Sequence, residues 1–244
     1  MHCAMKKKGR CSMKKVLVCE DEDSIREFVV INLKRSGYDV VDVNCGEEAL
    51  RVFEEGGNFD VALLDIMMPG IDGMKVCKKI REKNTTMGII MLSAKSQEMD
   101  KISSLMIGAD EYITKPFSIS ELIARVDAVC RRVGMSHSKP EEQSLLISGP
   151  FTLNLKSRTV FKNGKQIDLT QVEYQIMEYF FRNQNTALDR TSILNHIWGE
   201  SYYGDDKIVD VNIRRIRMKI EDEPSSPKYI LTIWGYGYKW SAGT

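Results

Sequence analysis

Four apolar segments in the first half of the chain each end in a polar side chain that could take part in phosphoryl chemistry. Asp65 follows the run 61–64 and is the most informative of these residues. The other three segments end at Glu20–Asp21, at Ser93 and at Lys115. Polar groups at the C-terminal ends of parallel strands gather at one edge of a sheet, so we expect these side chains to lie close together.

The nucleophile of this cluster would be Asp65, which could attack phosphorus and form an aspartyl phosphate. Phosphoryl transfer needs little from a protein beyond alignment and charge neutralisation. We therefore expect Lys115 to pair with phosphoryl oxygens and Ser93 to donate a hydrogen bond to another of them.

The acidic residues of the cluster suit a magnesium ion, which prefers hard oxygen ligands and retains some of its waters. We expect Asp21 and Asp65 to bind Mg²⁺ directly. Met67 would bind the ion through its backbone carbonyl, and Glu20 would bind it through water.

Each of these residues also has an ordinary structural explanation when it is taken alone. Glu20–Asp21 could cap a helix that starts near Ser24. Lys115 could be a solvated loop residue, and Ser93 could belong to a turn. Coincidence at four successive strand ends is a poor explanation, so we favour a common site.

The composition indicates a globular protein of two domains. The chain has 244 residues, of which 43% are hydrophobic and 28% are charged. No apolar stretch reaches the roughly 18 to 20 residues that cross a bilayer, so we expect no membrane contact. The six cysteines lack paired spacing, which favours reduced thiols and a cytoplasmic location. Residues 1–13 are basic without an apolar core, and we expect a disordered tail rather than a secretory signal.

Between residues 14 and 132 the pattern predicts an α/β domain in which five strands alternate with five helices. Such an alternation is typical of a doubly wound, five-stranded parallel sheet. The predicted strands span 16–19, 38–43, 60–64, 88–92 and 111–113, and the predicted helices span 24–36, 47–55, 73–83, 97–107 and 119–132.

The pattern changes after a polar stretch at 133–144, which contains Gly134 and Pro140 and is typical of a linker. Residues 145–241 then predict a second, α+β domain. Short strands come first, with a hairpin signal at Asn163–Gly164. Three helices follow, and an alternating segment predicts a closing hairpin; these elements span 171–181, 191–198, 207–221 and 228–240. This order is typical of a winged-helix module.

The third of these helices combines an apolar stripe with a basic surface. Val209, Ile213, Ile216 and Ile220 recur at three- and four-residue steps and should be buried. The surface that remains carries five cations against the single acid Asp210, which indicates docking on phosphates. A solvated basic helix is the alternative. The five cations are Lys207, Arg214, Arg215, Arg217 and Lys219.

Short motifs surround the strand ends at Glu20–Asp21, 64–70 (LDIMMPG), Asp72–Gly73, 91–94 (MLSA) and 108–117 (GADEYITKPF). Together they resemble the receiver domain of two-component response regulators. The resemblance implies a flavodoxin-like fold, a sensor histidine kinase that phosphorylates Asp65, and a cis peptide bond before Pro116. It also implies that Ser93 and Tyr112 form a switch that responds to the phosphoryl group.

The same resemblance implies that phosphorylation favours a homodimer. Members of the family pair through the fourth helix, the fifth strand and the fifth helix of the receiver. Two positions depart from the family pattern, because Ser104 replaces a usual glycine and Met106 replaces a usual acid. The charged residues of the implied dimer face are Lys101, Asp110, Glu121 and Arg125.

Further motifs lie at Leu169–Thr170, Arg190, 196–199 (HIWG), 209–217 (VDVNIRRIR) and 235–238 (GYGY). They look like the winged-helix effector domain of OmpR/PhoB-type regulators. The resemblance implies that 207–220 is a recognition helix in the major groove of DNA promoter repeats. Base edges would be met by Ile208, Val211, Asn212 and Arg215, and phosphates by Arg190, Trp198, Lys207, Arg214, Arg217 and Lys219.

Two further points follow from the winged-helix resemblance. Trp234 stands where many members carry an arginine for the minor groove. The segments 168–187 and 199–206 are where relatives meet RNA polymerase.

A phosphatase that uses an aspartyl nucleophile, of the haloacid dehalogenase type, is the enzymatic alternative. Such enzymes place a general acid two residues after the nucleophile, where this chain has Met67, which cannot transfer a proton. No histidine falls in the site segments, so we expect at most slow self-dephosphorylation and no other enzymatic activity. The second alternative is a DNA-binding regulator that works without phosphate, against which the presence of Asp65, Ser93 and Lys115 argues.

Overall fold

The computed structural model describes residues 13–94, 98–134, 144–200, 202 and 204–242. The tail expected over residues 1–13 lies outside the described residues except for Met13. The expected linker, 133–144, lies outside them except at its two ends. No helix within the described ranges is long and apolar enough to span a membrane.

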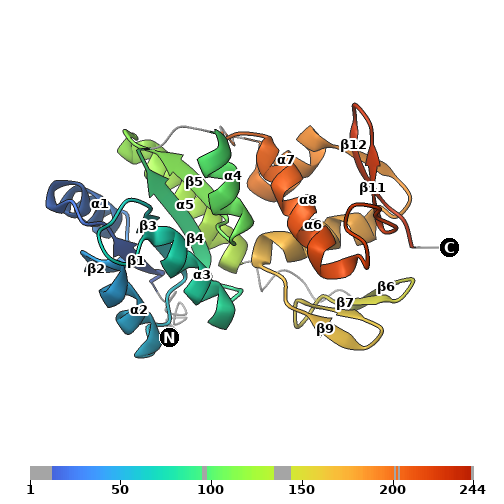
Figure 1. Cartoon of the computed structure of the whole chain (residues 1–244), viewed down its shortest axis with the longest axis horizontal. Helices are drawn as coiled ribbons and strands as arrows, with labels where there is room; N and C mark the ends of the chain where they lie inside the picture. The colour runs from blue at the N-terminus through green and yellow to red at the C-terminus, as the bar shows by residue number, and fades with distance from the viewer. Residues whose placement is uncertain (1–12, 95–97, 135–143, 201, 203, 243–244) are drawn as a thin grey trace, which may run out of the picture.

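The first domain is the predicted parallel sheet with helices on both faces (Figure 1). The strands lie in the order β2-β1-β3-β4-β5, and all neighbours are parallel. Its strands are β1 (Lys15–Cys19), β2 (Asp39–Val43), β3 (Val61–Asp65), β4 (Gly88–Ser93) and β5 (Glu111–Thr114). Its helices are α1 (Asp23–Arg35), α2 (Gly46–Glu54), α3 (Gly73–Lys83), α4 (Glu98–Met106) and α5 (Ile119–Gly134).

Both faces of this sheet are buried, which explains the unbroken apolar runs of β3 and β4. Leu63 and Ile90 face the layer of α1 and α5, whereas Leu64 and Met91 face the layer of α2 and α3. The order of the strands reverses between β1 and β3. Open α/β sheets bind ligands at this kind of switch point, outside the C-terminal ends of the strands.

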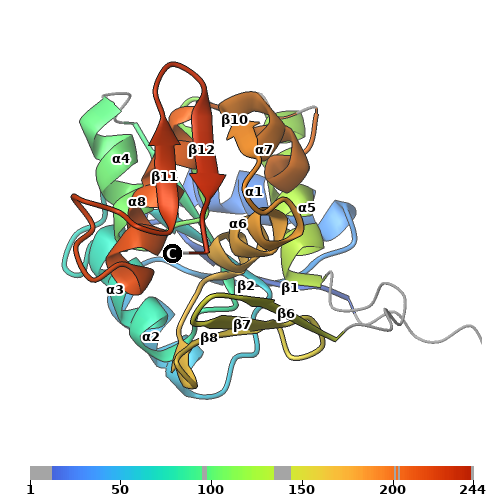
Figure 2. The same cartoon turned by 90° about the vertical axis from the view of Figure 1, so that its right-hand side faces the viewer.

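The second domain begins with a four-stranded antiparallel sheet, continues with three helices and ends in a three-stranded sheet (Figure 2). Its strands are β6 (Leu145–Ser148), β7 (Phe151–Asn154), β8 (Thr159–Lys162), β9 (Lys165–Ile167), β10 (Ala187–Asp189), β11 (Ile230–Ile233) and β12 (Gly237–Trp240). Its helices are α6 (Gln171–Arg182), α7 (Arg190–Trp198) and α8 (Lys207–Ile220).

Local signals explain where the helices of the second domain begin. Thr170 and Glu173 form a capping box at the start of α6, and Asp189 caps α7 by accepting a hydrogen bond from Ser192 N. The closing hairpin is confirmed as β11 and β12. Strand β10, which pairs with β12, was not predicted. A strand of three residues is too short for its alternation of apolar and polar side chains to be recognised.

The two domains lie against each other, with α4 of the first beside α8 of the second (Figures 1 and 2). Their apolar residues form one continuous cluster that reaches from Leu64 in β3 to Trp240 in β12. Helix α5 ends at Gly134, two residues beyond the predicted end, so it extends into the segment predicted as linker.

Candidate functional site

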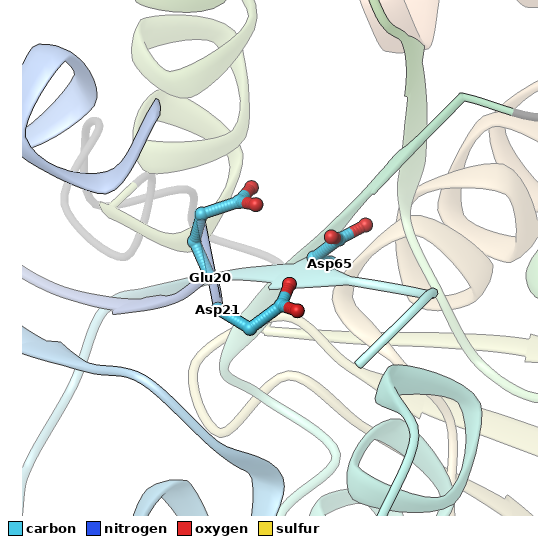
Figure 3. A group of neighbouring side chains, drawn as sticks. All are labelled: Glu20, Asp21 and Asp65. Atoms are coloured by element: carbon cyan, nitrogen blue, oxygen red, sulfur yellow. The ribbon is translucent and has the colours of Figure 1, made fainter. Parts of the chain in front are cut away.

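Three carboxylates meet at the C-terminal edge of the parallel sheet (Figure 3). Asp65 ends β3, and Glu20 and Asp21 directly follow β1, which is the neighbouring strand. One oxygen from each of the three lies within 4.8 Å of the others. Within the described ranges this is the single such group of His, Cys, Asp or Glu, and its hard oxygen donors fit Mg²⁺.

Lys115 supplies the counter-charge for this acidic group. It follows β5, and its Nζ lies 2.6 Å and 2.9 Å from the carboxylate oxygens of Glu20 and 3.0 Å from Oδ2 of Asp65. The Lys115–Pro116 peptide bond is cis, as the family resemblance implied. The side chain of Lys115 is only 14% exposed, so both of its ion pairs are largely shielded from water.

Burial changes the proton affinity of both partners in the Lys115–Glu20 pair. Burial raises the pKa of Glu20 to about 7, although the hydrogen bond from Lys115 acts in the opposite direction. Burial alone would lower the pKa of Lys115, but its hydrogen bonds to Glu20 and Asp65 outweigh this effect and raise the pKa. Lys115 therefore remains a cation at neutral pH.

The loop after Asp65 packs tightly against the start of α3. A Cβ atom on Gly73 would lie 2.1 Å from the carbonyl oxygen of Asp65, so only glycine fits at this position. Asp72 caps α3 by accepting a hydrogen bond from Lys75 N. Met67 lies in the same loop, and its backbone N–H donates to Oδ1 of Asp65 over 3.3 Å. The backbone of Met67 thus lies beside the acidic group.

The two residues expected to form the switch are in contact. Ser93 ends β4 and is fully buried. The hydroxyl of Tyr112, in β5, is hydrogen-bonded to Ser93, and burial raises the pKa of this tyrosine. The two side chains are therefore directly linked.

Three of the four residues expected on the dimer face line one cavity between the domains: Lys101, Glu121 and Arg125. Asp110 is an exception, because it is only 4% exposed and pairs with Arg81 over 2.7 Å inside the receiver. Its expected part in a dimer contact stays a prediction. Sequence reasoning missed Glu111, which pairs with Arg125 over 3.2 Å. The sequence signal that could have identified Glu111 is its position directly before Tyr112, a residue already expected to take part in the switch.

The residues expected to read DNA bases are buried rather than accessible. Ile208, Val211 and Asn212 on α8 are at most 6% exposed. Arg215, expected on the surface of the helix, is 5% exposed and pairs with Glu173 over 2.9 Å. That expectation of exposure is wrong here, because helical periodicity within α8 cannot reveal the receiver that covers it.

The residues expected to bind phosphates differ in their surroundings. Lys207 and Arg214 are exposed on α8. Arg190 pairs with Asp210 over 2.9 Å, Lys219 pairs with Glu173 over 2.7 Å and Arg217 donates to the carbonyl of Ile230, whereas Trp198 is only 2% exposed. Trp234 projects from the turn between β11 and β12 and is 91% exposed.

Family models agree with this geometry. Residues 16–127 match the response regulator receiver domain, and residues 164–240 match the C-terminal domain of transcriptional regulatory proteins. The chain therefore belongs to the two-component response regulators, and within them to the OmpR/PhoB type, in which a winged-helix DNA-binding domain follows the receiver.

Relatives with the same domain order are similar over nearly the whole chain. The sensory transduction protein RegX3 of Mycolicibacterium smegmatis is 38% identical over 227 residues, which cover 93% of this chain and 99% of that protein. RegX3 of Mycobacterium tuberculosis (strain H37Rv) is 39% identical, and the match again covers 93% of this chain and 99% of that protein.

Solved structures give a similar result. A point mutant of RitR superposes with a TM-score of 0.75 at 25% identity, and the match covers 94% of this chain and 100% of that chain. DrrB of Thermotoga maritima, an OmpR/PhoB homologue, is 31% identical over 94% of this chain and 99% of that chain, with a TM-score of 0.50. The RitR value includes both domains, so the domains of RitR have a similar relative placement.

Proposed function

We propose that the chain is a phosphorylation-controlled transcription regulator in which Asp65 accepts the phosphoryl group. The main support is the position of Lys115, which contacts Asp65 and Glu20 at the acidic edge of the sheet. A receiver domain implies a sensor histidine kinase as its phosphate donor, and the winged-helix domain implies DNA as its target. Because the target is DNA, we place the protein in the cytoplasm.

The chemistry of the site supports phosphoryl acceptance. The carboxylate of Asp65 would attack phosphorus while Lys115 holds the phosphoryl oxygens and Ser93 donates a hydrogen bond to one of them. Asp21, Asp65 and the Met67 carbonyl would hold Mg²⁺, with Glu20 acting through water. When bound, Mg²⁺ would neutralise charge on the phosphoryl group.

We propose that the domain is a phosphoacceptor with slow self-dephosphorylation rather than a metabolic phosphatase. Met67 offers no proton-transfer group beside Asp65. Of the three histidines, His196 lies in α7, stacked on Tyr179, and the other two lie outside the described residues. Sustained turnover of a phosphomonoester would support the phosphatase instead.

Phosphorylation would act by favouring a receiver dimer that binds repeated DNA sites. Two linked DNA-binding domains gain affinity because the second binds at a high effective concentration. Relatives use the segments 168–187 and 199–206 to contact RNA polymerase, and we propose the same role for them here. A regulator that works without phosphate remains the alternative, and an intact acidic site with Lys115 and Ser93 argues against it.

Mass spectrometry tests the proposal directly. The full chain, incubated with Mg²⁺ and acetyl phosphate, should gain the mass of one phosphoryl group. Asp65→Asn should gain none, because its amide is not a nucleophile. Asp60→Asn is a matched control, since Asp60 precedes the same strand but pairs with Lys14 away from the site, and it should still be phosphorylated. If the chain forms no adduct, or if Asp65→Asn forms one, the proposed phosphoacceptor is wrong.

A further inference from the structure

The turn between β11 and β12 projects from the second domain and carries two exposed aromatic side chains (Figure 2). It consists of Trp234, Gly235 and Tyr236, because the strand pairing ends at Ile233 and Gly237. Trp234 is 91% exposed and Tyr236 is 48% exposed. Within the described ranges, no other large hydrophobic side chain is as exposed as that of Trp234. An indole with so little buried area contributes little to the stability of the fold, so stability does not explain its presence.

The hairpin is fixed to α8 through both of its strands. Arg217 on α8 donates to the carbonyl oxygen of Ile230 over 2.6 Å and to Oγ1 of Thr232 over 2.9 Å, both in β11. Tyr238 in β12 donates to Oδ1 of Asp210 on α8 over 2.7 Å. The turn and α8 therefore move together, and binding of α8 to DNA would fix the position of the turn against the same duplex.

The base of the hairpin is also held from its other side by β10 and the start of α7. Strand β12 pairs with β10, and a Cβ atom on Gly237 would lie 2.1 Å from the carbonyl oxygen of Leu188. The backbone N–H of Arg190 donates to the carbonyl oxygen of Tyr236 over 3.4 Å. The domain thus holds the backbone at the turn and leaves the side chain of Trp234 outside.

The hairpin differs from α8 in charge. It carries no charged residue between Lys228 and Lys239, whereas α8 exposes Lys207 and Arg214. Cations on α8 can bind the phosphate backbone, whose contribution to affinity is electrostatic. An uncharged turn gains little from phosphates, so apolar and stacking contacts with the bases are the contacts that it can make.

The geometry of a duplex limits where the turn can lie. An α-helix fills the major groove, and the neighbouring groove is the minor groove, across one phosphate backbone. Apolar side chains that enter the minor groove act as wedges, which part a base step and bend the duplex towards the major groove. We propose that Trp234 is such a wedge and inserts its indole into a base step beside the bases that α8 contacts. The inference rests on the DNA binding of the proposed function and identifies a residue that determines its specificity.

A wedge selects its sequence through the ease with which a base step comes apart. Pyrimidine–purine steps, such as TA and CA, unstack and kink more easily than other steps. Because the turn is fixed to α8, Trp234 would favour such a step at a constant distance from the bases that α8 contacts. This preference needs no hydrogen bond between Trp234 and a base edge.

Two substitutions at the same position separate a wedge from a phosphate contact. Trp234→Ala removes the indole, and Trp234→Arg replaces it by a cation. Neither should disturb folding, because Trp234 is 91% exposed. Ile147→Ala is the matched control: Ile147 is 65% exposed in β6 of the same domain, on the side away from the turn (Figure 2).

The experiment uses full-length chains and a duplex that the wild type selects from a random pool in the presence of Mg²⁺ and acetyl phosphate. Each adenine of the duplex is replaced in turn by 2-aminopurine, whose fluorescence rises when it unstacks. Anisotropy of a labelled duplex gives the Kd at several salt concentrations. The selection is repeated with Trp234→Ala.

The wild type should raise the fluorescence at one step. Trp234→Ala should abolish this rise, bind at least about fivefold more weakly, and select duplexes without the preferred step. Its dependence of log Kd on log salt concentration should match that of the wild type, because no ion pair is lost. Trp234→Arg should also abolish the rise but steepen this dependence by about one. Ile147→Ala should behave as the wild type does.

The inference is wrong if the wild type unstacks no step, if Trp234→Ala keeps the rise in fluorescence, or if Trp234→Ala binds as tightly as the wild type. A missing phosphoryl adduct would instead remove the proposed control by phosphorylation and leave the wedge intact. A chain that forms the adduct and selects a duplex, but unstacks no base, would retain the proposed function and lose the wedge.

Discussion

Lys115 allows three carboxylates to approach one another at the end of the sheet. Glu20 and Asp65 are at most 4% exposed, so their mutual repulsion is poorly screened by water. The ammonium group of Lys115 contacts both of them and offsets that repulsion. Asp21 is exposed and lies at the open side of the group, where an incoming cation would meet it first.

Asp21 is the residue whose replacement tests the cation site most selectively. Asp21→Asn removes one negative charge and one strong oxygen ligand. Supporting residues around a metal already change affinity by about 10- to 100-fold, so we expect Mg²⁺ to bind at least about tenfold more weakly. Calorimetric titration would measure the affinity. Asp23→Asn is the control, because Asp23 has an exposed side chain that pairs with Arg26. Unchanged Mg²⁺ affinity in Asp21→Asn would remove Asp21 from the ligand set.

Much of the acidic site was predictable from the sequence, because its residues follow strands whose type and direction are evident. Asp21, Asp65 and Lys115 needed only a parallel sheet to bring them together. The distances between these side chains were not predictable, because they depend on how Glu20 and Asp65 share the single positive charge of Lys115. Glu111 was missed because its bond to Tyr202 spans 91 residues and its pairing with Arg125 depends on how α5 packs beside β5.

At the scale of elements, Arg81 joins α3 to the loop before β5. Its guanidinium pairs with Asp110 over 2.7 Å and donates to the carbonyl oxygens of Gly108 and Met87. Asp110 also accepts a hydrogen bond from Ile89 N in β4. This group holds Asp110 inside the receiver, and it positions the end of α4 where Arg215 binds.

Arg81→Ala should destabilise the receiver strongly, because it leaves the buried carboxylate of Asp110 without its cation. Breaking a buried pair by removing one partner costs about 3 to 5 kcal/mol of unfolding free energy. Urea denaturation followed by circular dichroism would measure the loss. Lys83→Ala is the matched control on the same helix: Lys83 pairs with Glu54 on the surface, and the loss should be no more than about 1 kcal/mol. Equal losses in the two variants would contradict this assignment.

At the scale of the whole molecule, the sequence was sufficient to predict two domains and their order. It was not sufficient to predict the contact between them. The apolar stripe of α8 was predicted from its periodicity, but Ile208, Val211 and Arg215 lie outside that stripe and are buried as well, and Arg215 donates to the receiver. The carbonyl oxygens that accept from Arg215, those of Leu105 in α4 and Ala109 just after it, lie about a hundred residues earlier, and no local pattern relates the two surfaces.

In the proposed mechanism, phosphorylation of the receiver controls the DNA-binding domain. A phosphoryl group at Asp65 would draw Ser93 and Lys115 towards it. Tyr112, hydrogen-bonded to Ser93, would then alter the cavity where Tyr202 and α8 meet the receiver. DNA affinity should therefore depend on the chemical state of one carboxylate in the receiver.

The most direct test compares DNA affinity before and after phosphorylation in wild type and in Asp65→Asn. The probe is a duplex selected from a random pool by the phosphorylated wild-type chain, and fluorescence anisotropy reports the apparent Kd. Acetyl phosphate with Mg²⁺ should tighten binding of the wild type by about tenfold or more and leave Asp65→Asn unchanged. Equal affinity of the wild type with and without phosphorylation, or an equal response of Asp65→Asn, would contradict the account.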